Sequence, residues 1–349
     1  MNAETSGLSH NQRKFNSWST AKDSYRLLAL GLISLFMCSI LPLSIMAPVP
    51  LVMAFLLFGK FRGFLLIVGT AALLVALNLL SYLPSSSSGG LFSQMMGETL
   101  VLYFSSVLCA FSVLEIIVKK REPSVGILRN GFLLLAIFLL GLGLVSHFSH
   151  FSILNYFRQE IIALIVKFKA ENAQLLSGPG EEVRELQAYL ENPDKILNWF
   201  PVIFFMGIFL GLWVSLFIVL RSLPLWKHKE AYPFTLEDLK KFKVSEYMIW
   251  PLIVALILFI GSDYGLPKWS EVVGESMLYC LGLFFFFQGF GILLDFLTYL
   301  KIFGIMRSFF IFGTLWMGPK YLALLGVFNT WFDFRKFFKT NTNNEGDRI

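Results

Sequence analysis

Two polar side chains interrupt a long apolar stretch near the end of the chain and are the first candidates for chemistry. Gln288 and Asp295 lie within residues 272–300, seven positions apart, so an α-helix would place both on one face. An ionised carboxylate inside a bilayer is strongly unfavourable unless it is paired or hydrated, so Asp295 is a candidate for a binding or gating role. Gly289 and Gly291 lie nearby and would let a second backbone approach closely.

The end of the chain offers partners for this carboxylate. We expect Asp295 to pair with Arg335 or with Arg307, and Asp333 to complete a polar cluster at one end of the helices. Two interpretations remain open: a salt bridge that locks helices together, and a gate or ligand contact at the inner mouth of a cavity. Glu275, at the other end of the same stretch, is expected simply to be solvated.

Motifs for catalysis or metal binding do not occur in the sequence. There is no HExxH, CxxC, P-loop, GxGxxG or GxSxG pattern. Cys38, Cys109 and Cys280 all lie in apolar blocks and are interpreted as small buried apolar residues. His147 and His150 lie three apart, but no further spaced histidine would complete a metal site. We therefore expect no catalytic residues, no metal and no cofactor.

The elements that position these residues are membrane-spanning helices. The chain has 349 residues, 56% of them hydrophobic and only 15% charged, whereas soluble domains have about 25% charged residues. A helix needs about 20 apolar residues to cross a bilayer. The sequence therefore predicts an all-α, polytopic transmembrane helix bundle of about 8–10 spans. The clear spans are 27–46, 63–83, 98–118, 127–147, 201–221, 248–264 and 272–300.

Three shorter segments are less regular. Residues 48–59 come after Pro42 and contain Pro48 and Pro50, and are interpreted as a short crossing or a broken half-helix. Residues 302–318 and 320–335 flank Gly318-Pro319 and are interpreted as a tight closing hairpin.

The basic residues predict the orientation of the bundle. All but seven of the 29 Lys and Arg residues fall on one side of the expected spans. Because cytoplasmic loops are enriched in Lys and Arg, both termini are expected in the cytoplasm. This asymmetry also accounts for the net charge of +6, so no nucleic-acid partner is expected. The seven exceptions are Arg158, Lys167, Lys169, Arg184, Lys195, Lys268 and Lys320.

Five regions follow from these spans. They are a cytoplasmic tail at 1–26, an N-terminal bundle at 27–148, an external helical hairpin at 149–200, a C-terminal bundle at 201–338 and a cytoplasmic tail at 339–349. A cytoplasmic loop at 222–247 contains a short helix after Thr235, whose hydroxyl can cap it. This helix is interpreted either as lying along the anionic inner leaflet or as an ordinary capped loop helix. The hairpin has an apolar face of Ile153, Phe157, Ile161, Leu164, Ile165 and Phe168.

Several short motifs resemble those of the YybS-like bacterial membrane proteins. They are Phe287-Gln288-Gly289-Phe290-Gly291, Leu325-Gly326-Val327-Phe328-Asn329, Trp331-Phe332-Asp333-Phe334-Arg335-Lys336 and the segment Leu41-Pro42-Leu43-Ser44-Ile45-Met46-Ala47-Pro48-Val49-Pro50. The family usually has an acidic residue at the position of Asn329. The resemblance implies a bacterial inner-membrane protein without an established substrate, distantly similar to substrate-binding membrane subunits of vitamin transporters.

Two functions compete on this basis. The first is binding or transport of a small apolar or lipid-like molecule, with the lipid bilayer as surroundings, because the expected interior has few polar residues for a charged solute. The second is a structural or assembly protein that presents its hairpin and loop to a membrane protein partner. A polar-lined cavity reaching Gln288 or Asp295 would favour the first, and a solid apolar interior the second.

Overall fold

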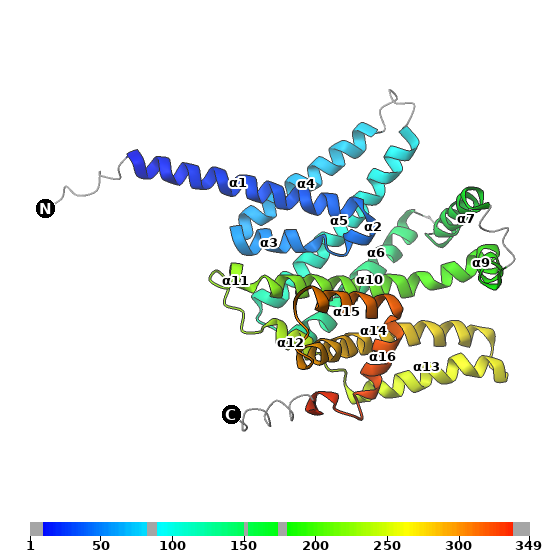
Figure 1. Ribbon diagram of the computed structural model, residues 1–349. Coiled ribbons are helices and arrows are strands. Elements are labelled where there is room, and N and C mark those ends of the chain that lie inside the picture. Colours follow the sequence, from blue (N-terminus) through cyan, green and yellow to red (C-terminus); the bar gives the residue numbers. More distant parts are fainter. Residues whose placement is uncertain (1–9, 82–88, 150–152, 174–179, 338–349) are drawn as a thin grey trace, which may run out of the picture. The chain divides into compact units, whose positions relative to one another are not determined.

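The computed structural model describes residues 10–81, 89–149, 153–173 and 180–337 of the chain. Every regular element in these ranges is a helix, which confirms the all-α fold class (Figure 1). The expected tail at 339–349 and the beginning of the tail at 1–26 lie outside the described residues.

The chain folds as two compact units, whose boundaries fall inside α6 (Pro123–Ser149) and α10 (Pro193–Arg221). Unit 1 comprises residues 1–134 and 208–236, and unit 2 comprises residues 135–207 and 237–349. Unit 1 also contains α1 (His10–Ser39), α2 (Leu41–Ser44), α3 (Pro48–Phe58), α4 (Lys60–Ser81), α5 (Gly89–Val118) and α11 (Leu223–Trp226). Unit 2 also contains α7 (Ile153–Glu171), α9 (Glu181–Glu191), most of α12 (Leu236–Lys240), α13 (Ile249–Gly261), α14 (Lys268–Tyr299), α15 (Gly304–Met317) and α16 (Pro319–Phe328).

Seven helical segments among the described residues are long and apolar enough to cross a bilayer, so this is a multi-pass membrane protein. They are Leu41–Phe58, Lys60–Leu80, Gly97–Val118, Pro123–Phe148, Ile196–Arg221, Glu246–Tyr264 and Lys268–Tyr299. The bent pair Gly304–Trp316 and Pro319–Phe328 raises the count to eight if it is one broken span. The last six of the clear spans predicted from the sequence coincide with six of these segments.

The first span differs from the prediction of a helix over 27–46. Helix α1 ends at Ser39, because Pro42 lacks the N–H that would continue its hydrogen bonds. The apolar segment then continues through α2 and α3, which together form one candidate span. In Figure 1, α1 runs toward α2 and α3 runs back toward the start of α4.

Buried polar contacts hold the helices of unit 1 together. The Ser34 hydroxyl of α1 donates a 2.9 Å hydrogen bond to the carbonyl of Ala47. The Cys38 sulfur lies 3.6 Å from the Ser106 hydroxyl of α5, and the Tyr103 and Thr70 hydroxyls are hydrogen-bonded between α5 and α4. Such contacts stabilise helix pairs where lipid provides no hydrogen-bond partner.

The final two helices form a sharp bend rather than two antiparallel spans. Helices α15 and α16 meet at 94°, so the prediction of a closing hairpin over 302–318 and 320–335 is wrong. Gly318 has a φ of 153°, a conformation that glycine adopts far more easily than other residues, and Pro319 starts the next helix. Helix α16 ends at Phe328, short of the predicted end.

Helix α14 is the packing centre of unit 2. A Cβ on Gly289 would overlap the carbonyl oxygen of Leu322 in α16, and one on Gly326 would overlap the carbonyl oxygen of Phe285. The two backbones therefore touch, as the sequence predicted for Gly289. A Cβ on Gly274 would likewise crowd the backbone of α13 at Phe259. Glycines thus place α14 directly against both neighbours.

The described residues of the segment 149–200 include α7, α9 and the first turns of α10. Two contacts tie α7 to the beginning of α10: the rings of Phe157 and Phe200 have centroids 4.3 Å apart, and the Arg158 guanidinium lies 3.0 Å from the Asp194 carboxylate. These contacts hold the first turns of α10 in place within unit 2.

Candidate functional site

The charged residues of α14 lie toward its two ends. Between Glu275 and Asp295 the helix contains no Asp, Glu, Lys or Arg. This stretch of 20 residues corresponds to about 30 Å, the thickness of the hydrocarbon core. The end near Asp295 has an ion-pair cluster, and the end near Glu275 has a pocket. The two are therefore separate sites.

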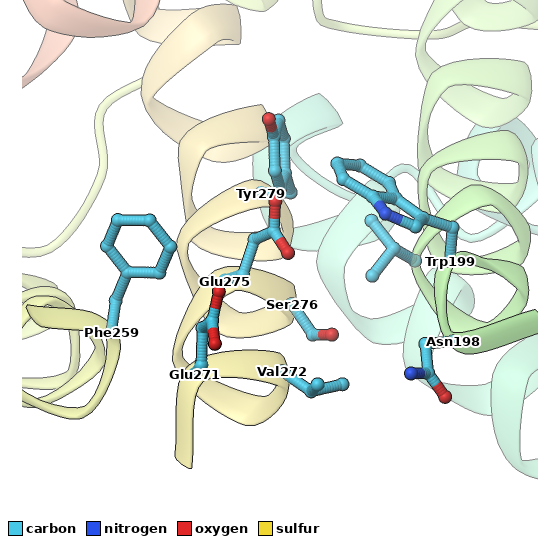
Figure 2. Close-up of a pocket in the computed structure, with 9 residues that line it drawn as sticks. Asn198, Trp199, Phe259, Glu271, Val272, Glu275, Ser276 and Tyr279 are labelled. Atoms are coloured by element: carbon cyan, nitrogen blue, oxygen red, sulfur yellow. The ribbon is translucent and has the colours of Figure 1, made fainter. Parts of the chain in front are cut away.

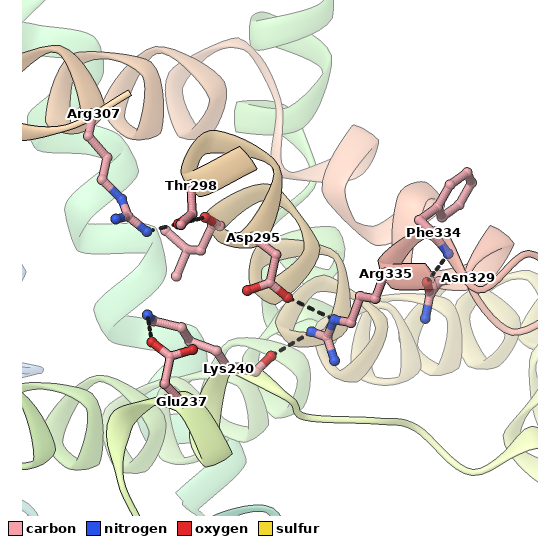
Figure 3. A network of polar contacts seen from close by, with 9 residues as sticks. Glu237, Lys240, Asp295, Thr298, Arg307, Asn329, Phe334 and Arg335 are labelled. Atoms are coloured by element: carbon pink, nitrogen blue, oxygen red, sulfur yellow. Dashed lines mark hydrogen bonds and ion pairs between the residues drawn. The ribbon is translucent and has the colours of Figure 1, made fainter. Parts of the chain in front are cut away.

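Asp295 lies against Arg335, one of the two partners expected from the sequence. Its Oδ2 atom is 3.0 Å from Arg335 Nε, and the two side chains are 30% and 18% exposed (Figure 3). The Nε–H is not directed at the carboxylate, so this contact is an ion pair without a hydrogen bond. Arg335 Nη2 donates a 2.6 Å hydrogen bond to the carbonyl of Lys240. The absence of a side chain at Gly291 leaves room for that carbonyl.

Arg307 and Asp333 do not join this pair. Arg307 Nη2 donates a 3.2 Å hydrogen bond to the backbone carbonyl of Leu294, one residue before the carboxylate. Asp333 pairs with Lys336 at 3.7 Å, and both side chains are at least half exposed. The expectation that Asp333 completes the cluster is therefore wrong. Its backbone begins a final helical turn that directs its side chain toward Lys336, whereas Arg335 reaches back to α14.

Gln288 cross-links three segments and is fully buried. Its Oε1 accepts a 2.7 Å hydrogen bond from the N–H of Val244, and its Nε2 donates a 3.0 Å hydrogen bond to the carbonyl of Gly326. Both ends of the side-chain amide are therefore used by backbone groups. This arrangement fits a structural role, and a ligand-binding role for Gln288, Asp295 or Arg335 stays a prediction.

The short helix α12 faces the protein. Leu239 and Phe242 are buried, and the Phe242 ring lies edge-on against Phe287 of α14 with centroids 5.8 Å apart. Lys240 is only 12% exposed and pairs with Glu237 at 2.5 Å. Of the two interpretations of this helix, the ordinary loop helix fits and the one lying on the lipid leaflet does not, because its apolar face is already covered by protein.

A pocket of about 240 Å³ lies at the opposite end of α14. It is formed by the first turns of α10, the end of α13 and the first turns of α14 (Figure 2). Its lining residues are Asn198, Trp199, Val202, Phe259, Glu271, Val272, Glu275, Ser276 and Tyr279. The lining does not include Gln288 or Asp295, so this is not the cavity expected from the sequence.

Local features of the sequence explain why α10 can form one wall. Pro201 lies inside α10 and cannot donate a hydrogen bond to the carbonyl of Leu197, so the helical hydrogen bonds are interrupted at the pocket. Trp199 of this interrupted turn packs on Tyr279 of α14, with ring centroids 4.6 Å apart. The contacts of α7 with Asp194 and Phe200 hold the same turns.

The wall of the pocket opposite α10 is formed by polar side chains that recur at regular spacing along α14. Glu271, Glu275 and Tyr279 recur every four residues and so share one helix face. Glu275 therefore lines a pocket, whereas the sequence led us to expect a merely solvated residue. The four-residue repeat of polar side chains, together with a proline-interrupted helix, is the signal that could have indicated this site.

The pocket is small and mixed in character. About 240 Å³ admits the polar head and adjoining carbons of an amphiphile rather than a whole lipid. Carboxylates, an amide and hydroxyls lie beside apolar valines and aromatic rings. Such a lining can bind a molecule with one polar and one apolar end.

Comparison with known proteins gives no relative: no family model, no curated protein and no solved structure matches the chain. The fold and composition therefore define the class, which is a polytopic helical membrane protein.

Proposed function

We propose that this protein binds or transports a small amphiphilic, partly apolar or lipid-like molecule through the pocket between α10, α13 and α14. The observation that supports this function is the pocket itself, which combines an aromatic pair with carboxylates beside the proline-containing turn of α10. Gln288 is fully buried and both ends of its amide bond to backbone groups, so we place the binding site at the other end of α14.

We further propose a bacterial inner membrane and both termini in the cytoplasm. The basic residues favour this orientation. Within unit 1, the pair of α1 and α3 runs out and back, so the start of α1 lies at the same end as the α3–α4 junction (Figure 1). Within unit 2, the ion pair of Asp295 with Arg335 brings the chain after α16 back to the end of α14. This return favours a re-entrant pair over a broken span for α15 and α16. The YybS-like motifs support the same membrane.

Copurification tests the binding function. The protein purified in dodecyl maltoside should carry a small amphiphile that mass spectrometry detects after extraction with organic solvent. Trp199→Leu should lower the amount bound, because it removes the aromatic wall of the pocket. Trp250→Leu is the matched control, since Trp250 is 68% exposed and does not line the pocket. Equal amounts in both variants would contradict binding at this pocket.

A second candidate function is the assembly of membrane proteins. It is supported by α7, where Leu164 and Phe168 lie four residues apart on one helix face and are 63% and 39% exposed. An apolar surface of this kind on a solvated hairpin suits a protein partner. Crosslinking from Leu164→Cys in intact membranes should then yield a discrete adduct. Leu164→Cys that gives no adduct, while the copurifying amphiphile is retained, would remove this candidate.

A further inference from the structure

The charged lining of the pocket has a single sign. Among the residues whose side chains the structure describes, Glu271 and Glu275 are the charged ones in the lining, and no Lys or Arg of that set lines it. The two carboxylates lie one turn apart on the same face of α14, and Figure 2 shows both on the wall beside Tyr279. Within the described part of the chain, Glu271 has neither an ion pair nor a hydrogen bond with another side chain. The site therefore presents negative charge that the protein does not neutralise at Glu271.

Aromatic rings surround the space next to these carboxylates. Trp199 and Tyr279 form a tilted pair, with 58° between their ring planes, and Phe259 lines the wall contributed by α13. Faces of such rings attract cations, and tryptophan does so most strongly. Carboxylates and aromatic rings in one small pocket are the combination that recognises organic ammonium groups.

The position of the pocket strengthens this attraction. The pocket lies about 30 Å along α14 from Asp295, and so at the opposite boundary of the hydrocarbon core. Close to the hydrocarbon core, where the dielectric constant is low, opposite charges attract each other more strongly than in bulk water. Val202 and Val272 provide apolar lining for carbon atoms beside the charge.

We infer that the pocket selects amphiphiles with a positively charged ammonium head, held by Glu271 and Glu275 and stacked against Trp199 and Tyr279. This inference rests on the proposed function, since it names the chemical class of the molecule that the pocket binds. An anionic head would be repelled by both carboxylates, and a neutral head would gain only the apolar and ring contacts.

Three probes with the same hexyl tail test the selection: hexyltrimethylammonium, hexyl glucoside and hexyl sulfate. Their dissociation constants are measured by isothermal titration calorimetry on the full chain in dodecyl maltoside, at low and high salt. We expect the ammonium probe to bind about tenfold more tightly than the glucoside, a difference of about 1.4 kcal/mol. The sulfate should bind most weakly, and high salt should reduce the preference.

Variants connect the preference to the pocket. Glu271→Gln and Glu275→Gln should each weaken binding of the ammonium probe about threefold, so that the two carboxylates together account for the tenfold preference, and leave binding of the glucoside unchanged. Trp199→Leu should weaken both probes. Asp263→Asn is the matched control, because it removes one exposed acidic charge from the end of α13 without touching the lining.

The possible outcomes separate the two claims. Equal affinity for the ammonium and glucoside probes, both lost in Trp199→Leu, would overturn the ammonium selection and leave amphiphile binding intact. Binding of no probe, or binding that none of the lining variants changes, would overturn the proposed function itself. Circular dichroism and gel filtration of each variant exclude misfolding as the cause of a loss.

Discussion

The side-chain amide of Gln288 donates a 3.0 Å hydrogen bond to the carbonyl of Gly326, 38 residues later in the chain. The same amide accepts a hydrogen bond from Val244 through its oxygen. One side chain thus joins α14 to α16 and to the segment after α12. In a lipid environment these backbone groups have no water to replace it. Gln288 therefore stabilises the end of unit 2 that contains the ion pair.

Replacing Gln288 with Leu should destabilise the protein by about 2–5 kcal/mol, because it leaves the N–H of Val244 and the carbonyl of Gly326 buried without partners. Unfolding in dodecyl maltoside, followed by tryptophan fluorescence with increasing dodecyl sulfate, measures the loss. Thr314→Val is the control, since the Thr314 hydroxyl bonds only to Phe310 in its own helix. A Gln288→Leu variant as stable as Thr314→Val would contradict the cross-link.

Gly289→Ala and Gly326→Ala should each destabilise unit 2 by about 3 kcal/mol or more, since the added methyl group would overlap a backbone carbonyl that cannot move without separating α14 from α16. Gly282→Ala on the same helix should be neutral or stabilise by up to about 1 kcal/mol, because nothing lies within 4 Å of its added carbon. The temperature at which each purified variant aggregates ranks the variants by stability. The prediction fails if Gly289→Ala matches Gly282→Ala.

The pair of Asp295 and Arg335 can be tested by a double-mutant cycle. Asp295→Asn and Arg335→Gln should each lower the free energy of unfolding, and the double variant should lose less than the sum, with a coupling energy of about 0.5–3 kcal/mol. Arg307→Gln serves as the control, because Arg307 bonds to the Leu294 carbonyl instead. A coupling energy near zero would show that the ion pair contributes nothing to stability.

The same variants separate the two interpretations of Asp295. A salt bridge that only locks helices predicts that growth and ligand retention follow the stability of each variant. A gate predicts that Asp295→Asn changes ligand retention or release at a temperature where the variant is fully folded. Unchanged stability together with unchanged retention would exclude both interpretations.

Lys301 ends α14 in a left-handed conformation, with a φ of 55°. Its N–H bonds to the Thr298 carbonyl, and the N–H of Ile302 bonds to the Leu297 carbonyl, as in a Schellman motif. Glycine adopts this conformation without the steric cost of a side chain, so Lys301→Gly should stabilise by about 0.5–1 kcal/mol. Lys301→Val should destabilise by at least as much, because a β-branched side chain disfavours positive φ. Dodecyl sulfate unfolding measures both, and the opposite order would contradict the assignment.

The proposed orientation predicts which residues are accessible from each side of the membrane. In a background with Cys38, Cys109 and Cys280 replaced by Ser, Asn172→Cys should react with an impermeant maleimide in intact spheroplasts. Glu230→Cys should react only after the membrane is permeabilised. The reverse pattern would invert the topology, and reaction of both in intact spheroplasts would exclude the span between them.

Parts of the candidate site could be predicted from the sequence. Asp295 was predicted to need a partner, because a single carboxylate in an apolar stretch is recognisable without any knowledge of packing. The close approach of a second backbone at Gly289 was predicted as well. The sequence could not choose between Arg335 and Arg307, since both are expected at the same end of the spans as Asp295. The turn that directs Asp333 toward Lys336 depends on where the chain returns to α14.

The sequence alone determined the surroundings of this protein and most of its spans, because the length and polarity of a segment are local properties that already fix whether lipid or water solvates it. Only the tertiary structure decided that Gln288 bonds to backbone groups, that Phe242, which follows α12, packs on Phe287, and that Trp199 meets Tyr279 at a pocket. These outcomes depend on which distant segments lie within a few ångströms of each other. Hydrogen bonds, ion pairs and ring contacts act only over distances of a few ångströms, and the separation of two residues along the chain does not show whether they lie that close in space.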